Sequence, residues 1–294
     1  MLLFQIFAKK QDDDAEYMKQ YTGYISQFKP MSAGEIFASI LSQKPDIIIF
    51  GETHTLELHR KIISEHLGQF KKEGFGCIAL EYFSTDMQEM LDRAKETGDY
   101  AEVENHIKRY WDYDLGKAGQ SILEMVKSAH RQGFDVLAID ASEEEIVEEL
   151  GEMPAEVGLE RMKYDGKVGR FREEKMAEAL SRYKESGVIV LAGAGHTVEI
   201  KQNIGKNANV KTAFLIGGEK GGTNFFERAA RDAEKENEWL LIEKRKGAPP
   251  EYNWEIDYTI HIPQTEGKSA ERQKLEKMGN IRKAMRKEHE LEKE

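Results

Sequence analysis

The sequence has one cysteine, no long apolar run and no flexible linker, and each of these shortages narrows the possible class of protein. Since Cys77 is the only cysteine among 294 residues, disulfide bonds play no part and a reducing compartment is expected. No apolar run approaches the roughly 20 residues that span a bilayer. Without a segment rich in proline, glycine and serine, the chain is expected to form one large domain.

Basic residues are outnumbered as well. The chain has 54 acidic and 43 basic residues, for a net charge of -11. This charge argues against nucleic acids and anionic membranes as partners, because both need clustered lysine and arginine. The apolar opening at residues 1–8 is short and lacks a preceding charged segment, so it is not interpreted as a signal peptide. A cytoplasmic protein that acts on a small molecule or a peptide is the expectation.

Common catalytic motifs are also missing. There is no glycine-rich phosphate loop of standard spacing, no Gly-x-Ser-x-Gly elbow and no His-Glu-x-x-His helix. Any chemistry therefore has to come from another arrangement of side chains.

Two similar corners are present instead, far apart in the chain. Residues 47–50 lead into Gly51-Glu-Thr-His54, and residues 188–192 lead into Gly193-Ala-Gly-His196. In both, a short apolar, β-branched run meets a glycine and a histidine follows three residues later, which is typical of a buried parallel strand and the loop at its carboxyl end. Ligands bind at that edge of open α/β sheets, so both histidines are expected to face one pocket.

The remaining pattern predicts an α/β fold with a mostly parallel central sheet flanked by helices. A helical segment at 1–45 precedes an α/β domain at 46–263, which contains a helical insertion at 84–131 that could act as a lid or cap. A charged helix at 264–294 is expected to be solvated, to dock on the domain or to form a homodimer with a second copy. The expected strands are 46–50, 76–80, 134–139, 188–192, 212–216, 239–242 and 256–262.

Polar groups follow four of these strands. Glu52 and His54 follow the first, Glu81 the second, Asp140 the third and His196 the fourth. Because the carboxyl ends of parallel strands share one edge, these groups would meet in one cleft. Carboxylates and imidazoles together suit a divalent metal or a general acid/base pair.

Each group also has a structural interpretation. Glu52 could cap the next helix, His54 could bond a carbonyl, and Asp140 could simply begin a helix. Arg172 extends an apolar helical stripe and so needs an anionic partner, for which Glu81 is a candidate.

The quoted motifs together resemble one superfamily. Gly51-Glu-Thr-His54, Leu80-Glu81, Arg172-Glu-Glu-Lys-Met176 and Gly193-Ala-Gly-His196, in this order, are similar to the superfamily that joins ChaN-type haem-binding proteins, Tiki and TraB proteins, and erythromycin esterases. A second histidine five residues after His54, His59, is closer to the ChaN type. The N-terminal lipoprotein cysteine of ChaN-type proteins and the membrane segments of Tiki and TraB proteins are not found in this sequence.

The resemblance implies a duplicated strand-helix unit with Glu52, His54, Glu81 and His196 in a shared cleft and Arg172 nearby. Our first hypothesis is a hydrolase of esters or amides, in which those four side chains hold a divalent metal or polarise water, a histidine is the general base and Arg172 stabilises an oxyanion.

Other hypotheses remain open. One is a haem- or iron-binding protein with His59 or Tyr82 as the axial ligand. Another is an inactive scaffold that keeps the motif residues for stability alone.

Overall fold

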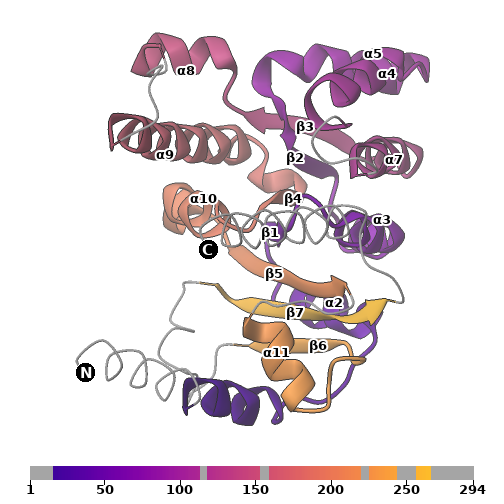
Figure 1. Ribbon diagram of the computed structural model, residues 1–294. Coiled ribbons are helices and arrows are strands. Elements are labelled where there is room, and N and C mark those ends of the chain that lie inside the picture. The colour runs from indigo at the N-terminus through magenta and orange to yellow at the C-terminus, as the bar shows by residue number, and fades with distance from the viewer. Residues whose placement is uncertain (1–15, 113–117, 153–158, 220–224, 244–255, 266–294) are drawn as a thin grey trace, which may run out of the picture.

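The computed structural model describes residues 16–112, 118–152, 159–219, 225–243 and 256–265, which are built around a seven-stranded sheet (Figure 1). The spatial order is β3-β2-β4-β1-β5-β7-β6, and only the β6–β7 pair is antiparallel. The strands are β1 (Ile47–Glu52), β2 (Cys77–Ser84), β3 (Asp135–Asp140), β4 (Val188–Gly193), β5 (Val210–Glu219), β6 (Leu240–Glu243) and β7 (Tyr258–Thr265). The α/β class and the mostly parallel sheet are therefore confirmed.

Helices cover both faces of the sheet. One face carries α2, α3 and α7, and the other carries α9 and α10 (Figure 1). Besides a helix at 16–25, the helices are α2 (Ala33–Leu41), α3 (Glu57–Lys72), α4 (Gln88–Thr97), α5 (Ala101–Ile107), α7 (Ala118–Arg131), α8 (Glu143–Leu150), α9 (Leu159–Ser181), α10 (Thr197–Ile204) and α11 (Phe225–Asp232).

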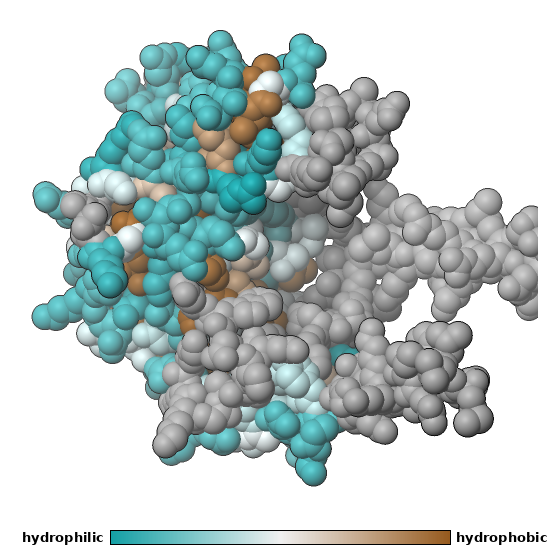
Figure 2. Space-filling model, turned by 90° about the vertical axis from the view of Figure 1, so that its left-hand side faces the viewer, coloured by the Kyte–Doolittle hydropathy of each residue, from teal (hydrophilic) through white to brown (hydrophobic). Residues whose placement is uncertain are grey.

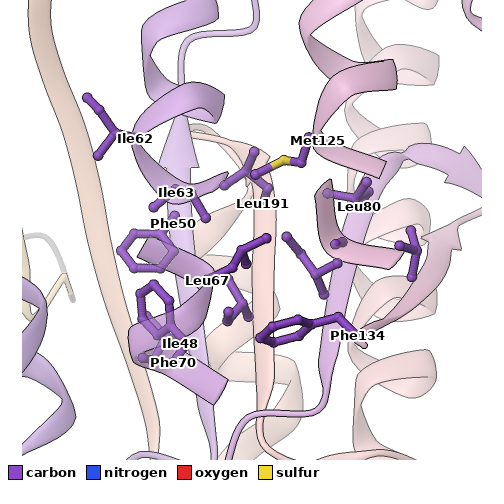
Figure 3. Close-up of a cluster of buried hydrophobic side chains, with 14 of the residues drawn as sticks. Ile48, Phe50, Ile62, Ile63, Leu67, Phe70, Leu80, Met125, Phe134 and Leu191 are labelled. Carbon is purple, nitrogen blue, oxygen red and sulfur yellow. The ribbon is translucent and has the colours of Figure 1, made fainter. Parts of the chain in front are cut away.

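Strand β1 explains why the central strands are apolar without interruption. Ile48 and Phe50 pack toward α3 (Figure 3), whereas Ile47 and Ile49 join the core under α9 and α10. All four side chains are fully buried. A strand that is covered on both faces has no solvated side, so it shows no alternation of apolar and polar residues.

Helix α3 follows the first corner and holds it against the sheet. Its apolar face includes Ile63, Leu67 and Phe70, whose 3.6-residue spacing places them together against the β1 side of the core (Figure 3). The chain leaves the helix through Gly74, which has a φ of +93°. Glycine adopts that conformation easily, whereas other residues are strained in it. The predicted helix end therefore coincides with a position that requires glycine.

The described parts of the segment 84–131 are mostly helical, and their helices pack into the main core. Leu91 of α4, Val103 of α5 and Val126 of α7 are buried in the same core as Ile48 and Phe50. These helices therefore form part of the main body of the fold.

The surface that carries α9 and α10 is mainly hydrophilic, with small separate apolar patches (Figure 2). No helix within the described ranges is both long and apolar enough to cross a membrane. The apolar opening at 1–8 lies outside the described residues, as does the predicted C-terminal helix apart from its first two positions.

Candidate active site

The two corners lie side by side because their strands are neighbours. β1 and β4 pair in parallel, with Gly51 opposite Ala192 and Glu52 opposite Gly193. A Cβ atom on Gly193 would lie 2.8 Å from His54 Nε2, and one on Gly51 would lie 2.8 Å from the Phe214 ring. Both glycines are thus required by close approach, and the loops that follow them leave the same edge of the sheet.

Glu81 lies at the centre of the site. Its Oε1 is 3.4 Å from His196 Nε2, 3.9 Å from His54 Nε2 and 2.9 Å from Arg172 Nη2. Its Oε2 accepts a hydrogen bond of 2.5 Å from the Gly193 amide. The structure therefore brings Glu81, both histidines and Arg172 to one place.

The site is partly open. The side chain of His54 is 28% exposed, that of His196 21% and that of Arg172 24%, whereas Glu81 is buried. Both imidazoles are thus partly exposed to solvent, while the carboxylate that they face stays out of bulk water. Strong electrostatic interactions are expected at a site of this kind, because few water molecules screen the charges.

A buried ion pair supports the first corner. The Nδ1–H of His54 donates to Glu52 Oε1 over 3.0 Å, and Arg60 Nη1 donates to both oxygens of Glu52 at 3.0 and 2.9 Å. Arg60 Nη1 also donates to the Tyr82 hydroxyl over 2.8 Å. Glu52 does not cap the next helix, since the N-cap residue of α3 is Leu56 and no side chain caps it. This hydrogen bond at Nδ1 leaves Nε2 of His54 directed at Glu81.

The pKa of His54 lies above its ordinary value. Burial acts most strongly and lowers it, but the hydrogen bond to Glu52 and the negative charges of Glu81 and Glu52 together outweigh burial and the charge of Arg60. Histidine titrates in the range where proton transfer at physiological pH is possible, which suits a group that takes and releases a proton.

A different carboxylate supports the second corner. His196 Nδ1 lies 2.8 Å from Oε1 of Glu173, which comes from α9. Burial raises the pKa of Glu173, and the bond to His196 opposes that rise. Glu173 is not among the site residues predicted from the sequence, although it directly follows Arg172 in the motif Arg172-Glu-Glu-Lys-Met176.

Arg172 finds the anionic partners that its position requires. Its Nε and Nη2 donate to Asp140 at 2.9 and 2.6 Å, and Nη2 also reaches Glu81. Burial raises the pKa of Asp140 despite this pairing, and the pairing raises the pKa of Arg172 against the effect of burial. Asp140 is therefore an ion-pair partner, and Ser142 begins helix α8 through a capping box with Glu145.

His59 and Tyr82 are buried and engaged. The Thr53 amide donates to His59 Nδ1 over 3.2 Å, and His59 Nε2 donates to the Gly217 carbonyl over 3.4 Å. Burial lowers the pKa of His59 to about 3, so the ring is neutral. The Tyr82 hydroxyl accepts from Arg60 and lies 3.3 Å from His54 Nδ1. His59 thus links the first corner to β5, and the hydrogen-bonding atoms of both side chains are already engaged.

The expected metal ligands do not form a metal site. No group of three or more His, Cys, Asp or Glu side chains in the described part of the chain is arranged to hold a metal ion. The ion pairs explain why: Arg60 occupies both oxygens of Glu52, and Arg172 binds Glu81. A divalent cation would have to displace a guanidinium ion from each carboxylate. The residues present therefore do not fit a metal that is held by Glu52, His54, Glu81 and His196.

Comparisons with known proteins identify the fold. No family model matches the chain, and no curated protein matches it significantly. Among solved structures, ChaN of Campylobacter jejuni, described with cofacial haem binding, is 19% identical with a TM-score of 0.51, over 67% of this chain and 90% of that one. The type III effector HopBA1 is 15% identical with a TM-score of 0.53, over 81% of this chain and 97% of that one. A Bacillus cereus protein is 10% identical with a TM-score of 0.50, over 84% and 97%. The predicted resemblance in fold to ChaN-type proteins is thus confirmed.

Proposed function

We propose that the protein is a hydrolase that cleaves an ester or amide bond in a small molecule or a peptide, with His54 and His196 as its acid/base pair. One observation carries this proposal: two imidazoles, each bonded at Nδ1 to its own carboxylate, direct their Nε2 atoms at the same oxygen of Glu81. His59, by contrast, has both ring nitrogens bonded to the backbone. In His54 and His196, Nε2 faces a carboxylate oxygen at 3.9 and 3.4 Å.

His54 is assigned the role of general base. Its Nδ1–H is bonded to Glu52, so in the neutral ring Nε2 carries the lone pair and removes a proton from water as the water attacks the carbonyl carbon. Because the raised pKa keeps His54 protonated to a higher pH than usual, the rate should rise with pH through a midpoint above 6.5.

His196 is assigned the role of general acid. Oriented by Glu173, it donates its Nε2 proton to the leaving oxygen or nitrogen as the tetrahedral intermediate collapses and the bond to carbon breaks. Arg172 is held at the cleft by Asp140 and Glu81, and its exposed part stabilises the oxyanion of the intermediate. Proton exchange with solvent then returns both histidines to their starting states.

Hydrolysis of a panel of aryl and alkyl esters and amides tests this proposal. Replacing either histidine, as His54→Ala or His196→Ala, should lower kcat/KM by about 10²- to 10⁴-fold, the usual contribution of a general acid or base. The matched control is His66→Ala on α3, a histidine that bonds the Ile62 carbonyl outside the site. Chelation with EDTA should leave the rate unchanged. Full activity in both histidine variants would end the proposal.

Haem binding is the second candidate, because the fold is shared with ChaN of Campylobacter jejuni, whose structure is described with cofacial haem binding. The ligands expected from the sequence, His59 and Tyr82, are buried, so an axial bond requires their present hydrogen bonds to open. Titration with hemin should then produce a Soret band that is lost in Tyr82→Phe or His59→Gln. A spectrum without such a band would remove this candidate.

A further inference from the structure

The charged side chain of Arg60 is fully buried, and the proposed reaction gives it no role. It lies on α3 with a relative exposure of 0% and is the largest of the fully buried side chains among the described residues. An arginine is almost never buried to this degree unless it is paired. Its partners are Glu52, the Tyr82 hydroxyl and Ser121 of α7, whose Oγ accepts from Nε over 2.7 Å.

The pairing is not explained by stability alone. Arg60 Nη2 is buried and has no hydrogen-bond partner in the part of the chain that the structure describes. A buried ion pair is often no better for stability than a packed apolar pair, and an unpaired N–H group adds a further cost. The fold thus keeps a guanidinium ion at this place although an apolar side chain would serve the core as well.

We propose that Arg60 is a positioning residue for His54: by fixing and neutralising Glu52, it keeps the proton of the neutral imidazole on Nδ1, so that Nε2 carries no proton and acts as a base. Glu52 Oε1 is the shared atom, since it lies 3.0 Å from His54 Nδ1 and 3.0 Å from Arg60 Nη1. This inference rests on the proposed function and names the residue that controls the proton of its base.

The charges around His54 explain why losing Arg60 should raise the pKa of His54. The groups that face His54 are Glu52 from β1, Glu81 and Tyr82 from β2, Arg60 from α3, and, across Glu81, His196 and Arg172. Without Arg60, the buried pair of His54 and Glu52 has a net negative charge and holds an additional proton more tightly. That proton resides either on the imidazole or between it and the carboxylate. In both states Nε2 bears a hydrogen and is no base.

Among the described residues, only the first corner has an arginine hydrogen-bonded to its supporting carboxylate. Arg60 follows His54 by six residues, and the equivalent position after His196 is Gln202, whose side chain is exposed. In the part of the chain that the structure describes, Glu173 pairs with His196, and no arginine or lysine donates a hydrogen bond to it. The pair of Glu52 and Arg60 therefore distinguishes the base from the acid.

The test is an NMR titration of the histidine ring signals in the full chain, which needs no substrate. In Arg60→Met, the midpoint of His54 should rise by about one pH unit or more, the usual effect of losing a neighbouring charge. Arg60→Lys keeps the charge and should show a much smaller shift. Arg93→Met, which removes an exposed arginine paired with Glu102, is the matched control and should show none. A folded Arg60→Met protein with the native midpoint would overturn the proposal.

A double variant covers the case in which Arg60→Met does not fold. Arg60→Met combined with Glu52→Gln removes both charges of the buried pair, and its His54 midpoint should fall below the native one because burial still acts on the ring while the carboxylate is gone. A native midpoint in this variant would also overturn the proposal. Titration without measurable hydrolysis in any variant would reject the proposed function but still decide the role of Arg60.

Discussion

The two glycine-histidine corners share a sequence pattern and adjacent strands, yet they support their histidines differently. At the first corner the carboxylate Glu52 belongs to the same strand and is neutralised by buried Arg60. At the second corner the carboxylate Glu173 comes from helix α9, outside the corner itself, and its side chain is 10% exposed. The duplicated backbone thus places two imidazoles, and the side chains outside the repeat set the charge around each.

The position of each histidine and its role in proton transfer therefore have different causes. The register of β1 against β4 is enough to bring the loops together, whatever side chains follow. Which histidine takes a proton and which donates it depends on the balance of charge at Nδ1, and that balance differs between the corners. Variants at equivalent positions of the two corners should therefore have unequal effects.

The largest difference is expected between the supporting carboxylates. Glu52→Gln leaves the Arg60 guanidinium buried without its counterion and should lower the free energy of unfolding by about 3–5 kcal/mol. Glu173→Gln changes a partly open pair and should cost about 1 kcal/mol or less. Urea denaturation followed by circular dichroism measures both. Glu102→Gln, in an exposed ion pair, is the control. Equal losses at the two corners would contradict the comparison.

The second largest difference is expected between the alanine variants of Gly51 and Gly193. In Gly51→Ala the new Cβ would lie 2.8 Å from the Phe214 ring, 2.9 Å from Thr197 Cγ2 and 3.1 Å from Ala194 Cα, so overpacking should cost about 1–3 kcal/mol of stability. In Gly193→Ala the nearest atom is His54 Nε2 at 2.8 Å, at the end of a side chain that is 28% exposed and can shift away from the added methyl group. This variant should lose more activity than stability, as thermal unfolding and kcat/KM together would show. A fully active Gly193→Ala protein would be the contrary result.

The smallest expected difference lies in how the stability of the protein changes at acidic pH. His59 belongs to the first corner, and the equivalent position in the second is Lys201. Since its folded pKa is lowered to about 3, the unfolded state binds the proton first, and stability should fall as the pH drops from about 6.5 toward 3. The loss should be about 1 kcal/mol between pH 6 and pH 5. His59→Gln should remove this slope, whereas His66→Gln should keep it. Urea midpoints across this pH range decide between these outcomes.

The fold was accessible from the sequence because its signals are local. A run such as residues 47–50, buried on both faces, has to be apolar throughout, and the glycine behind it marks the end of the strand. Strand β2 is an instructive error of position: Glu81 was expected just after it, but the strand continues to Ser84, because the Gly193 amide and Arg172 satisfy the carboxylate inside it.

The partners in the site were not accessible, because they depend on contacts between distant segments. Arg60 stands in a charged helix, where an arginine ordinarily faces solvent. The depth of His59 depends on Gly217, which is 158 residues away. A metal was expected from the collected carboxylates, and the arginines that neutralise them have no signature in the spacing of the motifs. Charge balance in a buried site is a property of the packed molecule.

The strand order has a consequence for biosynthesis. β4 lies between β2 and β1 in the sheet, although both of those strands leave the ribosome before it. Neither of the early strands finds its central neighbour until residues 188–193 have been translated. The edges of β1 and β2 that face β4 therefore stay unpaired during that delay, and unpaired apolar strand edges favour aggregation of the nascent chain.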